Sequence, residues 1–292
     1  MNIVNILEEI EKVDGEIYER LNPRRQAMKD FFNVGKKISL AAMPLALGSM
    51  FNKAYGQTTL PTAVVDVLNF ALSLEYLEYH YYNHALLGTD VTFTYPGASR
   101  AAITVIRDHE KAHVDLLKGA LGASARAEIT YAMTDFTAGG AFPVYSSYPT
   151  FLAVAQGFED TGVRAYKGQA GALMVSPGVL QTALQIHSVE ARHAAQIRLM
   201  RSTPEGGSVA VKPWVSLGAA GQANDSGVPA LDLVYAGEDS VMQATISIPP
   251  LTGAPTANDG QKKAAVESFD EILVKAKVVE IANIFLRTGF KL

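Results

Sequence analysis

Two Glu-x-x-His pairs are the residues of this chain whose types and spacing are best suited to chemistry. They are Glu110 with His113 and Glu190 with His193, in a chain that has only six histidines. In an α-helix, positions i and i+3 lie on the same side, about one turn apart. Each pair can therefore present a carboxylate oxygen and an imidazole nitrogen to one metal ion at about 2.0–2.2 Å.

Two earlier glutamates extend this pattern. Glu75 precedes the first pair and Glu159 precedes the second, and each is followed seven residues later by a tyrosine, Tyr82 and Tyr166. Seven residues are nearly two helical turns, so each glutamate shares a helix face with its tyrosine. The region thus repeats the order Glu, Tyr, Glu-x-x-His.

The surroundings of these two glutamates place them inside the protein. Glu75 lies in the apolar stretch FALSLEYL and Glu159 in FLAVAQGFEDTGV. Burying four carboxylates without compensation is very costly, and two divalent cations would balance their charge. One Glu-x-x-His motif arises readily by chance. The prediction of a metal site therefore depends on the repeat of the whole pattern.

Neighbouring residues leave two alternatives open. Glu78 follows Glu75 by three residues and could replace it, but Ala85 stands where its tyrosine would be, so we favour Glu75. Tyr82 and Tyr166 either hydrogen-bond the carboxylates and donate an electron, or they fill the core as aromatic side chains with a satisfied hydroxyl group.

The composition restricts the metal ligands and the partners. The chain has 292 residues, a formal net charge of −4 and no cysteine. Thiolate catalysis, iron–sulfur clusters, zinc fingers and disulfides are therefore excluded, and a transition metal must be held by His, Asp and Glu. No basic field is present that would attract nucleic acid.

Helical periodicity predicts four helices around the candidate ligands. They span residues 61–87, 98–121, 150–174 and 179–201, with Gly or Pro near the ends of each. Two short connections flank a long Gly-rich link at 122–148. This order is typical of two helical hairpins joined by one crossover. We therefore predict a mainly α four-helix bundle over residues 58–202.

The ligand pattern resembles the carboxylate-bridged dinuclear site of the ferritin-like superfamily. The stretch LNFALSLEYLEYHYYNHALLG further resembles an exported ferritin-like group that includes plant desiccation-related proteins. The resemblance covers about residues 60–202. It implies that Glu75 and Glu159 each cap one metal ion and that Glu110 and Glu190 bridge the two ions. His113 and His193 are then the terminal nitrogen ligands.

Residues 1–57 resemble a twin-arginine export signal. Arg24 and Arg25 precede a lysine pair at 36–37, a weakly apolar run at 38–51 and small residues before Gln57. The apolar run is short for a membrane span. We expect export to the periplasm or cell envelope, with no stable transmembrane anchor after signal removal.

The remaining residues, 203–292, are predicted to be an extension that packs on the bundle. Residues 231–248 indicate two short strands around Gly237, and residues 262–287 indicate one amphipathic helix. The segment shows no ligand constellation, so we prefer a covering or oligomerisation role and leave a homo-oligomer open.

A carboxylate-rich dinuclear site favours iron or manganese. The first hypothesis is a di-iron oxidase or peroxidase that oxidises Fe(II) and reduces oxygen or peroxide in a stress-protective role. A dimanganese catalase is the alternative among enzymes. A non-enzymatic metal-binding or structural envelope protein is the alternative from another class.

Overall fold

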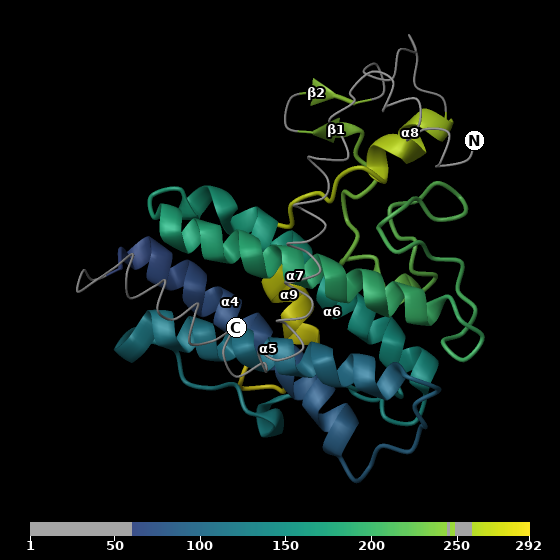
Figure 1. Cartoon of the computed structure of the whole chain (residues 1–292), viewed down its shortest axis with the longest axis horizontal. Helices are drawn as coiled ribbons and strands as arrows, with labels where there is room; N and C mark the ends of the chain where they lie inside the picture. Colours follow the sequence, from purple (N-terminus) through teal and green to yellow (C-terminus); the bar gives the residue numbers. More distant parts are fainter. Residues whose placement is uncertain (1–59, 244–245, 249–258) are drawn as a thin grey trace, which may run out of the picture. The chain divides into compact units, whose positions relative to one another are not determined.

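The computed structural model describes residues 60–243, 246–248 and 259–292 (Figure 1). The expected export signal at 1–57 lies outside these residues. Within the described part of the chain, no helix has both the length and the apolar character needed to cross a membrane.

Four long helices confirm the four that the periodicity predicts (Figure 1). They are α4 (Thr62–Leu87), α5 (Ser99–Leu121), α6 (Tyr148–Gln169) and α7 (Pro177–Arg201). Helix α4 packs on α5 and α6 packs on α7, which gives two helical hairpins. The link between them contains two 3-10 turns, η1 (Gly122–Ser124) and η2 (Tyr131–Met133). The predicted fold class, a mainly α bundle of two hairpins joined by a crossover, is confirmed.

Helix α6 begins slightly earlier than predicted because of its N-terminal cap. The backbone N–H of Thr150 donates to the Ser147 hydroxyl at 3.3 Å, and Pro149 occupies the first turn. The α-helix ends at Gln169, and the 3-10 turn η3 (Ala170–Leu173) follows it directly. The predicted end at residue 174 therefore includes this turn.

The four helices differ in how completely they are covered. Every residue of α6 from Phe151 to Tyr166 is buried, whereas α5 buries one face that includes Ile103, Glu110 and Leu117. A helix of a four-helix bundle normally keeps a polar face in water. The outer side of α6 must therefore be covered by another part of the chain.

The C-terminal segment supplies this cover. Its elements are η4 (Pro229–Leu231), β1 (Met242–Gln243), β2 (Ile246–Ser247), α8 (Asp259–Val266) and α9 (Lys275–Ile284). The two strands pair in antiparallel fashion. Helix α9 packs against α6.

Two short strands are present in this segment, but the prediction that they flank Gly237 is wrong, because both lie after it. Leu231, Val234, Tyr235 and Glu238 are buried, at spacings of three, one and three residues. Backbone hydrogen bonds from Val234 to Leu231 and from Glu238 to Tyr235 form successive turns there. These buried residues thus follow the spacing of helical turns, and the antiparallel pairing joins Met242–Gln243 to Ile246–Ser247.

The single helix predicted at 262–287 is wrong, because the chain breaks between α8 and α9 to pair with α6. Arg164 donates to the carbonyl oxygen of Glu271 at 2.9 Å, and the N–H of Leu273 donates to the carbonyl of Arg164 at 3.3 Å. A Cβ atom at residue 168 would lie 2.5 Å from the Leu273 carbonyl oxygen, so this approach requires Gly168. Bonds to α6 replace the helical bonds that would have continued α8.

Candidate metal centre

The structure brings all six predicted ligands together inside the bundle. Glu75 comes from α4 and Glu159 from α6, and one Glu-x-x-His pair comes from each of α5 and α7. All six side chains are buried. Helical spacing explains the convergence, since each of the four helices turns its ligand face toward the same interior point.

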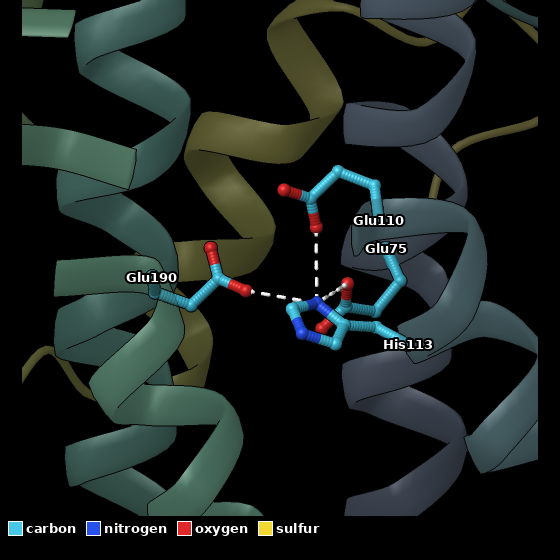
Figure 2. Close-up of side chains that lie close together, drawn as sticks. All are labelled: Glu75, Glu110, His113 and Glu190. Carbon is cyan, nitrogen blue, oxygen red and sulfur yellow. Dashed lines mark hydrogen bonds and ion pairs between the residues drawn. The ribbon is translucent and has the colours of Figure 1, made fainter. Parts of the chain in front are cut away.

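One group of ligands surrounds His113 (Figure 2). Its Nδ1 atom lies 3.1 Å from Oε2 of Glu75, 3.1 Å from Oε2 of Glu110 and 3.1 Å from Oε1 of Glu190. Three carboxylate oxygens from three helices therefore face one imidazole nitrogen.

A second group surrounds His193 in the same way. Its Nδ1 atom lies 2.8 Å from Oε1 of Glu110, 3.3 Å from Oε2 of Glu159 and 3.9 Å from Oε2 of Glu190. In each of the two groups, the candidate ligand atoms all lie within 4.8 Å of one another.

Glu110 and Glu190 belong to both groups. Each directs one carboxylate oxygen toward His113 and the other toward His193. Glu75 and Glu159 each belong to one group only. This arrangement would let Glu110 and Glu190 be shared between two metal ions while Glu75 and Glu159 each served one.

Several buried atoms at this point have no hydrogen-bond partner among the described residues. They include Oε1 of Glu110, Oε2 of Glu159, both carboxylate oxygens of Glu190 and Nδ1 of His193. The distances between them are short, but their alignment is not that of hydrogen bonds. Buried polar atoms are normally satisfied. Lone pairs that converge without donors fit metal ions, so the residues present suit a dinuclear centre.

The electrostatics lead to the same conclusion. Burial and then the charge of Glu110 raise the pKa of Glu190 well above its usual value. Burial opposes the charged form of His193, but the charges of Glu110 and Glu159 outweigh it and raise the pKa of His193 well above its usual value. These groups thus bind protons readily when no metal is present, and a metal ion would bind in competition with those protons.

The two tyrosines hydrogen-bond carboxylates across the bundle. Tyr82 of α4 donates to Oε1 of Glu159 on α6, and Tyr166 of α6 donates to Oε1 of Glu75 on α4. The sequence spacing places each tyrosine on the same helix face as the glutamate seven residues before it. In the structure, each tyrosine instead bonds the glutamate of the other helical hairpin. Each bond leaves the Oε2 atom of the glutamate facing the cluster. Electron donation by the tyrosines stays a prediction.

Glu78 is a further buried carboxyl beside the two groups, but it belongs to neither. A Cβ atom at residue 162 would lie 3.2 Å from Oε1 of Glu78 and 3.3 Å from Oε2 of Glu190, so Gly162 leaves room for both side chains. Burial and the charge of Glu190 raise the pKa of Glu78 well above its usual value. The structure places Glu75, and not Glu78, beside His113.

His109 supports one ligand from outside the cluster. Its Nδ1 atom lies 2.9 Å from Nε2 of His193, and the two rings are stacked. A contact at Nε2 fixes the ring orientation and leaves Nδ1 toward the glutamates. The sequence offers one signal for this role, since His109 precedes His113 by four residues on the same helix.

A second buried polar network lies next to Glu159, and its residues are not among those predicted from the sequence. Arg198 of α7 pairs with Asp160 of α6 at 2.6 Å and with Asp225 of the C-terminal segment at 2.8 Å. Tyr235 also donates to Asp160 at 2.6 Å. The network ties the C-terminal segment to the helix that carries Glu159.

The sequence signal for this network is a polar stripe in an otherwise apolar helix. Gln156, Asp160 and Arg164 follow one another at intervals of four residues, which places them on one face of α6. Gln156 donates to the Tyr235 hydroxyl at 2.7 Å, and Arg164 pairs with Glu238 at 2.7 Å. A polar stripe on a buried helix thus marks the docking of another segment.

Comparison with known proteins gives one finding. Residues 63–203 match the family model described as ferritin-like domain. No curated protein and no solved structure matches the chain. The matched segment contains all six residues of the two ligand groups.

Proposed function

Because residues 63–203 form a ferritin-like domain, we propose that this protein binds two iron ions, or alternatively two manganese ions, and reduces oxygen or peroxide there. The observation that carries the proposal is the pair of carboxylates, Glu110 and Glu190, whose two oxygens face different histidines. Carboxylate and imidazole ligands suit both metals.

The chain's own residues hold and shape such a centre. Glu75 and His113 would bind one ion and Glu159 and His193 the other, with the bridging glutamates shared. When bound, the two metal ions supply electrons to a small oxidant and are themselves oxidised. The tyrosine hydroxyl groups fix the capping glutamates, and His109 orients His193. The buried surroundings exclude bulk water from the ligands.

Metal reconstitution followed by oxidation assays tests this proposal. The metal-free chain is loaded anaerobically with Fe(II) or Mn(II), and elemental analysis is expected to find about two ions per chain. The iron form is then exposed to oxygen or to peroxide while ferric absorbance is recorded. The manganese form is tested for oxygen release from peroxide, the reaction of a catalase. Failure to retain metal would refute the dinuclear centre, and retention without any oxidation would favour a non-enzymatic metal-binding role.

We also propose export through a twin-arginine route, on the basis of Arg24, Arg25 and the weakly apolar run that follows them. A chain exported after folding would acquire its metal in the cytoplasm, where metal availability decides the occupant. Replacing both residues, Arg24→Lys with Arg25→Lys, is expected to leave folded, metal-loaded protein in the cytoplasm. Fractionation and metal analysis provide the readout. Normal export of the double variant would contradict the proposal.

A further inference from the structure

An apolar cavity lies beside the candidate metal centre, between α4, α5, α6 and α7. Its lining includes Leu74, Leu117, Tyr166, Thr182 and Ala183, and of all its lining residues only Gln169 is not buried. The turn η3, through Leu173, also contributes to the wall. The cavity is therefore an interior space near one end of the bundle.

The polar groups of the wall are largely occupied. The Thr182 hydroxyl donates to the carbonyl oxygen of Gly178 at 3.2 Å, and the Tyr166 hydroxyl donates to Glu75. Aliphatic and aromatic side chains and alanines form most of the remaining wall. Such a space offers few partners to water, and apolar cavities in proteins stay dry and take up apolar molecules.

The cavity is small. The centre of a water-sized molecule can move through about 20 Å³ of it, so a diatomic gas fits this space. Hydrogen peroxide has similar size, but it carries two hydroxyl groups whose burial without hydrogen-bond partners is unfavourable.

Tyr166 connects the cavity to the metal ligands. Its ring lines the cavity, and its hydroxyl bonds Oε1 of Glu75, whose Oε2 lies 3.1 Å from Nδ1 of His113. Tyr166 therefore contacts both the cavity and this ligand group.

From these observations we infer that the cavity is a dioxygen-binding site that supplies the dinuclear centre and favours dioxygen over peroxide as its oxidant. This inference rests on the proposed function, because it names which of the two oxidants the centre uses. Peroxide would have to approach by another route.

Xenon binding tests the site without reference to activity. Xenon is an apolar probe of small cavities, and an NMR titration of the full-length metal-free protein is expected to show saturable binding. Ala183→Leu and the milder Ala71→Val add methyl groups to the lining and should abolish or weaken it. The matched control, Ala101→Leu, lies on the exposed face of α5 and should bind xenon like the wild type. Unsaturable or absent xenon binding in the wild type would overturn the inference.

Stopped-flow oxidation of the iron-loaded protein tests the supply role. Both cavity variants should retain the wild-type metal content. Their oxidation by dioxygen should slow by about tenfold for Ala183→Leu, while oxidation by peroxide changes by less than about twofold. Equal slowing with both oxidants, or unchanged oxidation by dioxygen in a variant that has lost xenon binding, would overturn the inference. Xenon binding without any iron oxidation would instead refute the proposed function, and the supply role with it.

Discussion

Glu110 and Glu190 differ from the other candidate ligands because both oxygens of each carboxylate face the cluster. The capping glutamates use one oxygen to accept a tyrosine hydrogen bond and keep one for the centre. Replacing a bridging residue should therefore affect both metal ions, and replacing a capping residue should affect mainly one.

We expect Glu110→Ala to abolish binding of the metal pair, because the substitution removes one ligand atom from each of the two groups. Elemental analysis after reconstitution measures the result. Glu78→Ala is the matched control, since it removes a buried carboxyl that belongs to neither group, and it should retain about two ions per chain. If Glu78→Ala lost metal as completely as Glu75→Ala, the ligand assignment on α4 would be wrong.

The tyrosine bonds lead to a second expectation. Tyr82→Phe frees Oε1 of Glu159 from its donor, and loss of a hydrogen bond to a ligand typically weakens metal binding by about 10–100-fold. Competition with a chelator gives the affinity. Tyr81→Phe is a control at the next position, because the Tyr81 hydroxyl bonds the backbone carbonyl of Phe151 and no ligand. Equal metal affinity for the two variants would contradict this role of Tyr82.

At the residue scale, the sequence predicted which side chains share one face of a single helix. Spacings of three and seven residues place side chains on one helix face, so the six candidate ligands could be found before the structure was known. Contacts between helices could not be found in this way. Tyr82 and Tyr166 bond glutamates of the opposite hairpin, and His109 contacts His193. These contacts depend on how neighbouring helices are aligned along their axes, and no local sequence pattern contains that information.

At the scale of elements, α6 is the helix that depends most on its surroundings. It carries Glu159 toward the cluster and a polar stripe toward the C-terminal segment, and almost none of it reaches solvent. The four helices were predictable because their periodicity and their Gly and Pro boundaries are local signals. The break between α8 and α9 was not, because bonds to α6 override the helical tendency of that sequence.

The buried ion pairs of Arg198 should matter greatly for stability. Arg198→Met removes the partner of two buried carboxylates, Asp160 and Asp225, and breaking such a buried pair typically costs about 3–5 kcal/mol of unfolding free energy. Denaturant unfolding of the metal-free protein measures this cost. Lys277→Met breaks an exposed pair with Glu280 on α9 and should cost less than about 1 kcal/mol. Similar losses for both variants would contradict a stabilising role for the buried network.

At the scale of the whole molecule, the C-terminal segment completes the interior of the bundle. Arg164, Arg198 and Arg201 are all buried, and each bonds at least one residue beyond position 203. Deleting residues 203–292 would leave these charges without those partners and would expose the buried outer face of α6, including its polar stripe.

We therefore expect the chain truncated after residue 202 to be insoluble or to lack a cooperative thermal transition by circular dichroism. Removal of residues 1–57, the expected signal, is the control and should leave both solubility and the transition in place. A soluble, cooperatively folding bundle of residues 58–202 would show instead that the C-terminal segment is dispensable for the fold.

The cover over α6 also has a consequence for the order of events during biosynthesis. The residues that enclose this helix leave the ribosome after all six candidate ligands have emerged. Domains generally fold as units as the chain is made, but the helix that carries Glu159 lacks its outer wall until the covering residues beyond 203 have also emerged. Stable metal acquisition should therefore wait for this segment, and a chain stalled before it would have every ligand and still hold no stable centre.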